Sequence, residues 1–273
     1  MGGRIKVFSE VLNREIEIPE RPSRIVSISP AITETLYLLG LEDRIVGVSI
    51  YDHKPPRARE KPKVGSYFKV NMKMLEDLKP DLVLITTGAQ RKVLWELAEK
   101  YPTFPIPLPV SLSGIIDSVA QIGLVTGEME KATELEANLS RAIPELRFAL
   151  SGVKAYYEVF LGGPVTTGAH TYIADAFRLM GLETPFAGER TTWIYNPPAE
   201  RINEFSPQYI IYEYSSYAPT TPEKVKEELS TRGVELESDT KIILLEPDSL
   251  AHYGPSLFDT LRWLAREIRS QDS

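Results

Sequence analysis

The pattern of apolar and polar positions between residues 24 and 56 predicts a strand, a helix and a second strand. β-Branched residues dominate 25–28, which predicts a short buried strand. Pro30 follows at a place where a helix can begin without losing a hydrogen bond, and the apolar stripe of that helix ends at Gly40. Residues 44–50 predict the second strand, so the stretch is typical of a βαβ unit.

This unit carries a candidate ligand wall. In open α/β sheets, ligands bind outside the carboxyl ends of the strands. Ser29 and Pro30 follow the first strand, and Tyr51 follows the second. Tyr67 lies in a short extended segment, 64–70, and we expect it close to Tyr51.

The remaining pattern of the first half alternates between apolar runs and amphipathic segments. We expect a hairpin at 4–18, helices at 72–78 and 91–101, a buried strand at 81–86 and an extended segment at 104–110. Prolines interrupt that last segment, and proline cannot donate to a strand ladder. We therefore expect an edge strand there.

The second half repeats the alternation after two helices, 112–125 and 128–150. Pro144 should kink or restart the second of these helices, which looks like a rigid connector. We expect domains at 1–127, 128–150 and 151–273. In the last of these we predict strands at 155–161, 209–214 and 242–245, helices at 172–180, 199–205, 222–229 and 256–268, a short extended segment at 183–186 and a loop at 193–198.

Composition narrows the function. The chain is 42% hydrophobic and 25% charged, as globular proteins are, and its net charge of -7 argues against a nucleic-acid surface. The absence of cysteine excludes thiol catalysis, cysteine-bound zinc and iron–sulfur clusters. No apolar run reaches the length of about 18 residues that a membrane helix needs. Few amides against 21 prolines fit a thermophilic source.

Motifs for nucleotide binding and hydrolysis do not occur. We find no phosphate loop, no dinucleotide fingerprint, no GxSxG elbow and no HExxH helix, so we expect no catalytic residues, no metal and no cofactor. His53, His170 and His252 are far apart in sequence. A convergent three-histidine metal site stays an alternative to histidines that cap turns or line a surface.

Aromatic residues form the most informative pattern. They fall in predicted loops or at strand ends, namely Tyr51, Tyr67, Trp193, Tyr195, Tyr214, Tyr217 and Tyr253. Tyrosine and tryptophan give large, rigid contact areas, so the pattern favours a cleft for a bulky ligand over rings packed under loops. Glu76 and Glu200 lie on two short helices. They are either solvated side chains or docking carboxylates for a partner that carries arginines.

Several short motifs resemble a known family. They are SPAITE at 29–34, GVSIY at 47–51, LKPDLV at 78–83, TTG at 166–168, Trp193, Glu200, SPQ at 206–208, and Asp248 followed by Gly254 and Pro255. The chain resembles class III periplasmic substrate-binding proteins of ABC importers, a group that carries cobalamin, haem and ferric siderophores. The cobalamin-binding branch is the nearest likeness.

The resemblance implies an α/β fold of two Rossmann-like lobes bridged by a single long helix. It also implies that aromatic side chains hold a corrinoid, or another metal chelate, between the lobes. By this resemblance the ligand residues would be Pro30, Ala31, Tyr51 and Tyr67 from the first lobe, and Val165, Trp193, Asp248 and His252 from the second. Ser29, from its place after the first strand, and Tyr217 and Tyr253, from the aromatic pattern, complete the expected ligand set. The implied protein is no enzyme. It would be an extracytoplasmic monomer that delivers its ligand to a permease and its ATPase subunits.

The chain departs from the cobalamin-binding pattern at four places. Tyr67 replaces a tryptophan, Val165 a phenylalanine, Thr86 or Thr87 a tryptophan, and His252 an arginine. These changes make the expected cleft more polar. Of the two docking carboxylates of the family, Glu200 matches, whereas Lys73 stands at the other position and Glu76 lies one turn further along.

Two alternatives remain. The same transport role with a ferric siderophore, haem or an oxyanion chelate would use cationic contacts from Arg190 and His252, or an axial haem ligand among Tyr51, Tyr67 and His252. A cytoplasmic sensor or an enzyme on this scaffold is suggested by the start MGGRIKVFSE, which lacks the apolar core of a signal peptide. Against an enzyme, we find no nucleophile–base pair.

Overall fold

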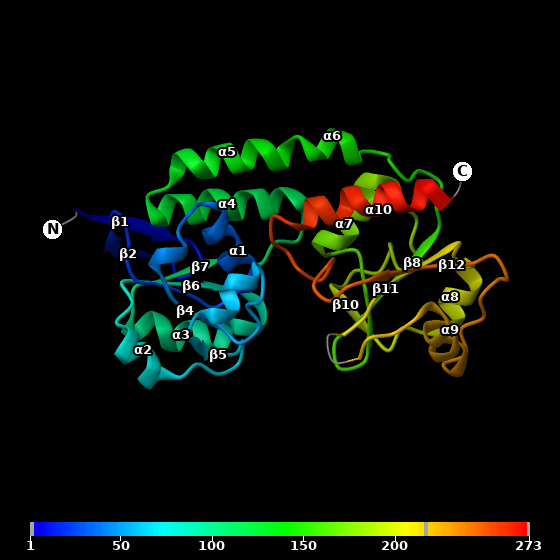
Figure 1. Ribbon diagram of the computed structural model, residues 1–273, viewed down its shortest axis with the longest axis horizontal. Coiled ribbons are helices and arrows are strands. Elements are labelled where there is room, and N and C mark those ends of the chain that lie inside the picture. Colours follow the sequence, from blue (N-terminus) through cyan, green and yellow to red (C-terminus); the bar gives the residue numbers. More distant parts are fainter. Residues whose placement is uncertain (1–2, 216–217, 272–273) are drawn as a thin grey trace. The chain divides into compact units, whose positions relative to one another are not determined.

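The computed structural model describes residues 3–215 and 218–271, and it divides the chain into two compact units. The first unit comprises Met1–Pro109 and Ser113–Ser140, and the second comprises Val110–Leu112 and Arg141–Ser273. Among the described residues, each unit contains a five-stranded sheet with helices packed on it (Figure 1). The expected architecture of two α/β lobes is confirmed. The expectation that 128–150 forms a domain of its own stays a prediction.

The sheet of the first unit is parallel throughout. Its strands have the order β5-β4-β3-β6-β7. Their bounds are β3 Ile25–Ser27, β4 Ile45–Ser49, β5 Lys63–Gly65, β6 Leu82–Thr86 and β7 Thr103–Ile106. An antiparallel hairpin, β1 Arg4–Ser9 and β2 Arg14–Pro19, precedes the sheet as expected.

The helices of this unit follow the predicted order. They are α1 Pro30–Leu38, α2 Met72–Leu78, α3 Arg91–Lys100, α4 Leu112–Thr126 and α5 Met129–Ser140, with Leu112 of α4 assigned to the second unit. Three short 3-10 helices lie at Glu42–Arg44, Pro56–Glu60 and Gly88–Gln90. α4 and α5 pack closely, because a Cβ atom added to Gly123 would lie 2.3 Å from Cβ of Ala132.

The edge position of β7 is confirmed. The carbonyls of Pro102 and Ile106 accept hydrogen bonds from the amides of Val83 (2.8 Å) and Thr87 (3.1 Å). Residues 102 and 106 therefore face β6. Because successive residues of a strand face opposite sides, the nitrogen of Pro105 faces the open edge, where its missing hydrogen breaks no ladder bond.

The segment 128–150 is interrupted, as Pro144 predicts. α5 ends at Ser140, and a second helix, α6 Ala142–Leu146, begins after Arg141. Pro144 has no N–H to donate to the carbonyl of Ser140, so the regular helical ladder breaks at this point. Pro144 itself lies in the first turn of α6, where amides lack an intrahelical partner.

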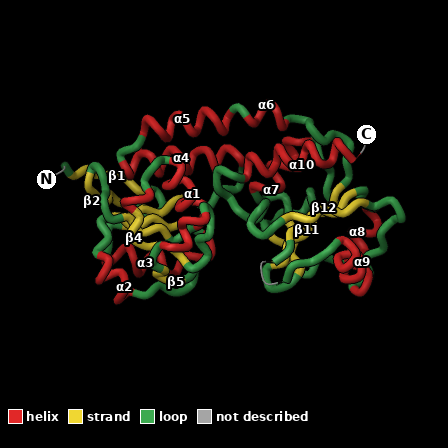
Figure 2. The backbone as a smooth tube through the Cα atoms, in the orientation of Figure 1, coloured by secondary structure: helices red, strands yellow, loops and turns green. Residues whose placement is uncertain are grey.

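The sheet of the second unit has the order β10-β9-β8-β11-β12. β8, β11 and β12 are parallel, whereas β9 and β10 join antiparallel. The strands are β8 Ala155–Phe160, β9 Pro164–Thr167, β10 Trp193–Tyr195, β11 Tyr209–Glu213 and β12 Lys241–Leu245. Besides α6, the helices are α7 Tyr172–Met180, α8 Ala199–Phe205, α9 Pro222–Thr231 and α10 Leu257–Gln271 (Figure 2).

Two predictions for this unit are wrong. Residues 193–195 were expected in a loop, but they form β10, which pairs with β9. Residues 183–186 were expected to be extended, but only Glu183 forms a bridge, with Lys154. Both segments are too short for alternation to be recognised, and β10 is stabilised by pairing with a strand that is distant in sequence.

Both faces of this sheet are covered. Tyr156 and Tyr157 are neighbours in β8, so their rings point to opposite faces. The Tyr156 ring contacts Phe186 with centroids 6.3 Å apart, in the core cluster that also contains Ile202 of α8 and Val225 of α9. The Tyr157 ring contacts Phe177 of α7 at 5.9 Å. The strand is buried on both sides, which fits its aromatic and apolar residues, with Glu158 as the charged exception.

Candidate functional site

The carboxyl edge of the first sheet gathers the candidate residues of this unit. All five strands are parallel, so the segments that follow them meet at one edge. Ser29, Pro30 and Ala31 follow β3 and begin α1, with Ser29 at the N-cap position. Their side chains are buried, Ser29 completely. These three residues therefore lie beneath the surface at the carboxyl edge of the sheet, and little of them is exposed to solvent.

Tyr51 and Tyr67 lie together on this edge, as the sequence predicted. Their ring centroids are 4.5 Å apart and the rings are tilted by 38°. Tyr51 is 39% exposed and Tyr67 is partly exposed. The pair therefore presents aromatic surface to solvent, next to the exposed side chains of Ile50 and Phe68.

A tight turn after β5 positions Tyr67. The amide of Ser66 donates to the carbonyl of Lys69 (2.8 Å), and the Ser66 hydroxyl accepts from the amides of Phe68 and Lys69. Gly65 precedes the turn with φ +143°, and a Cβ atom there would lie 2.3 Å from the Lys69 carbonyl oxygen. Only glycine fits this approach without distortion.

Asp52 anchors the segment that carries Tyr51. Its carboxylate is buried and accepts a short hydrogen bond from the hydroxyl of Ser49, and the Ser49 hydroxyl also accepts from the Tyr51 amide. Lys63 donates to the carbonyls of Asp52 (3.0 Å) and Ala58 (2.8 Å). Burial raises the pKa of Asp52, and burial also lowers the pKa of Lys63.

Gln90 was not recognised from the sequence. The strand order reverses between β3 and β6, and this is where open sheets bind ligands. Gln90 is buried there and donates to the carbonyl of Ile28 (2.7 Å), while its side-chain oxygen accepts from the amide and hydroxyl of Thr86. It ties together the two loops that flank the reversal.

In the second unit, the candidates Asp248, His252 and Tyr253 share one loop between β12 and α10. Asp248 and Tyr253 are partly exposed, whereas His252 is 5% exposed. The Tyr253 ring packs edge-on against Tyr172 of α7, with centroids 5.9 Å apart. Tyr217 lies outside the described residues.

Glu213 holds this loop, and sequence reasoning did not single it out. It is the last residue of β11 and is 1% exposed. Its carboxylate accepts from the amides of Ser249 (3.0 Å), Leu250 (2.9 Å) and Ala251 (3.0 Å), and from the hydroxyl of Tyr157 (2.9 Å). Burial raises the pKa of Glu213 despite these hydrogen bonds.

The other candidates of this unit lie on β9 and β10. Val165 is 1% exposed and pairs with Val159 near the carboxyl end of β8. Tyr195 pairs with Val165 and is 67% exposed. Trp193 is partly exposed and pairs with Thr167, two residues further from that end. Tyr195 is thus nearer than Trp193 to the carboxyl edge of β8.

The candidate docking residues occupy related positions in the two units. Glu200 is the second residue of α8, and Lys73 is the second residue of α2; both helices have seven residues. Glu200, Lys73 and Glu76 are all exposed. Glu200 also lies where the helix dipole favours a negative charge. This effect explains an acidic residue at that position even if no docking partner binds it. The docking role stays a prediction.

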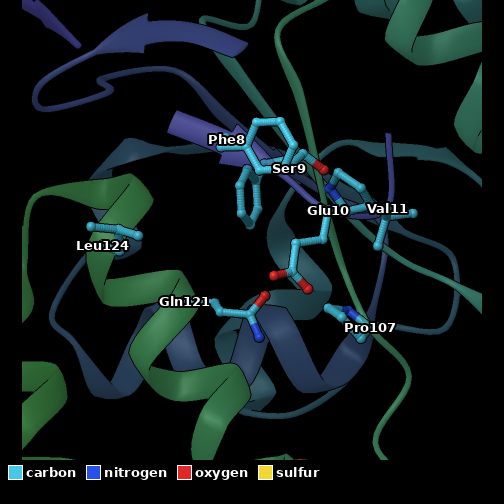
Figure 3. A pocket seen from close by; sticks show the side chains of 9 residues that line it. Phe8, Ser9, Glu10, Val11, Pro107, Gln121 and Leu124 are labelled. Atoms are coloured by element: carbon cyan, nitrogen blue, oxygen red, sulfur yellow. The ribbon is translucent and has the colours of Figure 1, made fainter. Parts of the chain in front are cut away.

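A separate pocket of about 280 Å³ lies elsewhere on the first unit (Figure 3). Phe8 and Glu10 from the hairpin, Pro105 and Pro107 from the β7 region, and Gln121 and Leu124 from α4 are among its lining residues. None of its lining residues belongs to the predicted ligand set. In the part of the chain that the structure describes, no three histidine, aspartate or glutamate side chains gather in a way that could hold a metal ion.

The fold and the carboxyl-edge aromatics are accompanied by a family match. A family model described as periplasmic binding protein matches residues 25–235, and since this is more than half of the chain, the protein belongs to that family. It is a substrate-binding protein of an ABC transporter. Members are extracytoplasmic, bind solutes rather than catalyse reactions, and work with a permease and an ATPase. Among the described residues, no helix has the length and apolarity needed to cross a membrane.

Two relatives are similar to this chain in sequence. An uncharacterized ABC transporter substrate-binding lipoprotein, YvrC of Bacillus subtilis, is 25% identical over 272 residues, or 96% of this chain and 84% of the relative. The vitamin B12-binding protein of Yersinia pseudotuberculosis is 29% identical over 196 residues, or 69% of this chain and 68% of the relative.

Solved structures share the fold. The vitamin B12-binding protein BtuF of Vibrio cholerae has a TM-score of 0.73 at 21% identity, covering 92% of this chain and 98% of BtuF. The heme-binding protein HutB of the same organism has a TM-score of 0.77 at 19% identity, covering 90% and 98%. The molybdate-binding protein MolA of Haemophilus influenzae has a TM-score of 0.79 at 18% identity, covering 98% and 92%. Proteins with this fold thus bind ligands of different chemistry.

Proposed function

We propose that the protein captures a corrinoid of the cobalamin class and delivers it to the permease of an ABC importer. The observation that carries this proposal is the half-exposed ring pair of Tyr51 and Tyr67 at the carboxyl edge of the first sheet. A macrocycle offers a wide, flat, apolar face with polar groups around its rim. Paired phenol rings with hydroxyl tips complement both features.

Each unit contributes its own contact residues in this proposal. From the first unit, Tyr51 and Tyr67 contact the ligand, with Ser29, Pro30 and Ala31 as the floor behind them. From the second, Trp193, Asp248 and Tyr253 make contacts, and the buried Val165 and His252 support them. Support from comparison comes from the Yersinia relative, which is named a vitamin B12-binding protein.

Haem is a second candidate, and one observation favours it. Tyr51 and Tyr67 lie side by side, and tyrosine serves as an axial ligand of haem iron in some proteins. His252, the other axial candidate, is 5% exposed and is therefore poorly placed to reach an incoming iron. HutB shares the fold and is named a heme-binding protein.

An oxyanion or a ferric siderophore has less support. Anions bind to runs of free backbone amides or to arginine clusters. The amides of Ser249, Leu250 and Ala251 form a run of this kind, but they are not free for an anion. The Glu213 carboxylate already accepts their hydrogen bonds. Arg190 is the exposed cation nominated from the sequence for a siderophore.

Parallel titrations test the proposal. The purified protein is titrated by calorimetry with cyanocobalamin, hemin, a ferric catecholate and molybdate under identical conditions. We expect cyanocobalamin to bind most tightly and to quench tryptophan fluorescence. A shifted and sharpened Soret band when hemin is mixed with the protein, together with no heat from cyanocobalamin, would instead establish the second candidate. No heat and no quenching with cyanocobalamin rejects the corrinoid proposal.

The proposal includes the working state of the protein. We infer that the chain acts as a monomer outside the cytoplasm, in line with the extracytoplasmic family. Light scattering of the purified protein tests the monomer. Fractionation of cells that express the native gene tests the location, and recovery in the cytosolic fraction would favour a sensor on the same scaffold.

A further inference from the structure

We propose that Glu213 is a positioning residue for ligand binding, because it fixes the loop between β12 and α10 that carries Asp248, His252 and Tyr253. The inference rests on the proposed function only in taking this loop as part of the ligand site. Glu213 itself is buried, with 1% of its surface exposed, so it is not available to contact a ligand directly. Its effect on a ligand would therefore be exerted through the loop backbone.

The first argument is the number of loop amides that one side chain holds. Three consecutive amides, from Ser249 to Ala251, converge on the Glu213 carboxylate at 2.9–3.0 Å. Asp248, immediately before them, has φ +57°, a left-handed conformation that helps successive amides point to one side. The loop thus forms an anion-binding concavity, and the occupant is a carboxylate of the chain itself.

The second argument is burial. A buried carboxylate without hydrogen-bond donors is costly, and so are buried amides without an acceptor. Leu250 is completely buried. Each partner therefore satisfies the other, and separating them would leave buried polar groups without hydrogen bonds. The hydroxyl of Tyr157, on the adjacent strand β8, fixes the carboxylate from the sheet side.

The third argument is a second attachment at the same residue. The hydroxyl of Tyr172 in α7 donates to the carbonyl of Leu250 (3.0 Å). The Tyr172 ring also packs against Tyr253. Leu250 is consequently held at its amide by β11 and at its carbonyl by α7. A loop that is ordered before binding does not lose conformational entropy when the ligand arrives, which favours affinity.

The test uses Glu213→Gln in the full chain, since glutamine keeps the shape but replaces one acceptor oxygen by a donor. Glu158→Gln is the control: Glu158 is equally buried on β8, but its carboxylate accepts hydrogen bonds from Tyr156 and Arg232 rather than from the loop. We expect hydrogen exchange at the amides of residues 249–251 to rise about tenfold or more in Glu213→Gln, as loss of hydrogen bonds to a charged acceptor predicts. Exchange at the β11 amides should remain at the wild-type level, and the control should leave the loop amides unchanged.

A titration distinguishes positioning from general support of the fold. In the wild type, the chemical shifts of the 249–251 amides should change together as Glu213 takes up a proton. The groups that face Glu213 are Tyr157 and Asp248, and Tyr172 lies beyond Tyr157. Glu213→Gln should abolish the shared inflection, whereas Glu158→Gln should retain it. A shared inflection that survives in Glu213→Gln comes from a group other than Glu213 and contradicts the assignment.

Ligand binding completes the test with cyanocobalamin as the probe. We expect Glu213→Gln to weaken binding, mainly through faster dissociation, and the control to bind as the wild type does. Unchanged loop exchange overturns the proposal, and so does faster exchange with unchanged affinity. If the wild type does not bind cyanocobalamin, the corrinoid function fails, while exchange and titration still decide whether Glu213 fixes the loop. Should Glu213→Gln not fold, Tyr157→Phe removes one bond to the carboxylate and must raise loop exchange by a smaller factor.

Discussion

The rings of Tyr51 and Tyr67 lie with their centroids 4.5 Å apart, although sixteen positions separate the two residues in the chain. One ring follows β4 and the other follows β5, so the pairing of these strands brings them together. Two rings held by different strands form a wider and stiffer aromatic face than either ring alone.

Alanine at either tyrosine should weaken corrinoid binding. We expect Tyr51→Ala and Tyr67→Ala each to cost about 2 kcal/mol of binding free energy, as aromatic anchors of interfaces do. The double variant should show a coupling of about 0.5–1.5 kcal/mol, typical of an aromatic pair. Calorimetry with cyanocobalamin measures both quantities. Phe68→Ala is the matched control, because Phe68 is exposed in the same turn; additive effects of the two tyrosines would contradict a shared face.

Trp193 should be a binding anchor of the second unit. We expect Trp193→Ala to weaken binding by about 2–4 kcal/mol, the range of an aromatic hot spot. Trp95→Ala, which removes an exposed tryptophan from α3, should leave affinity unchanged. Tyr195→Ala is measured in parallel because Tyr195 lies nearer the carboxyl end of β8. A loss confined to Tyr195→Ala would transfer the anchor role from Trp193 to Tyr195.

Gly65→Ala should displace Tyr67 and destabilise the first unit. Its φ of +143° is unfavourable for residues with a Cβ atom, and the added carbon would meet the Lys69 carbonyl. We expect a loss of about 1–3 kcal/mol in unfolding free energy, measured by urea denaturation, together with weaker ligand binding. Gly163→Ala should be neutral, since no atom lies within 4 Å of its added Cβ. Equal effects of the two substitutions would refute the steric explanation.

Glu200→Ala should separate binding from transport. Glu200 is exposed on α8, so we expect ligand affinity and unfolding free energy to change by less than about 0.5 kcal/mol. Uptake through the cognate permease should fall. Glu204→Ala, also exposed on α8, is the control. Normal uptake with Glu200→Ala would remove the docking role, and the same assay on Glu76→Ala and Lys73→Ala identifies the docking residue of the first unit.

Asp52 gives a prediction for the dependence of stability on pH. Its pKa is raised in the folded protein by burial, so the folded state binds the Asp52 proton more tightly than the unfolded state does. The stabilisation is complete below the unfolded pKa and is lost as pH rises through the folded pKa. Asp52→Asn lacks this contribution, so its stability relative to the wild type should rise as the pH increases from about 4 through the raised folded pKa of Asp52. Urea denaturation at several pH values measures the trend, and a falling relative stability would contradict it.

Local sequence signals were sufficient for most of the fold. The apolar run that forms β6 predicts a strand covered on both faces, because such a strand disfavours polar residues. The prolines of β7 predict a strand at the edge of the sheet, because proline cannot donate a ladder hydrogen bond. In the structure, Asn71, Thr171 and Thr221 cap α2, α7 and α9 with side-chain hydrogen bonds, in agreement with the predicted starts of these helices. The adjacency of Tyr51 and Tyr67 could be predicted because each follows a strand, and the carboxyl ends of parallel strands lie at the same edge of a sheet. The thermophilic source stays a prediction that a thermal unfolding midpoint would test.

What the sequence did not reveal depends on contacts distant along the chain. β10 exists because β9 offers it a partner, and three residues carry too little periodicity to show this. Gln90 and Glu213 are polar residues in apolar surroundings, and their importance lies in the loop amides and carbonyls that reach them. The Ile28 carbonyl lies 62 positions from Gln90, and the loop amides lie 36 to 38 positions from Glu213. No local motif encodes such a pairing.

Pro105 has a consequence beyond its own strand. The outer side of an edge strand is a template on which a strand from another molecule can be added, and such addition begins many aggregates. An approaching strand would find no donor at Pro105, in the middle of the four-residue β7. Pro105 therefore removes one hydrogen-bond donor that an added strand would need, which makes strand addition at this edge less favourable.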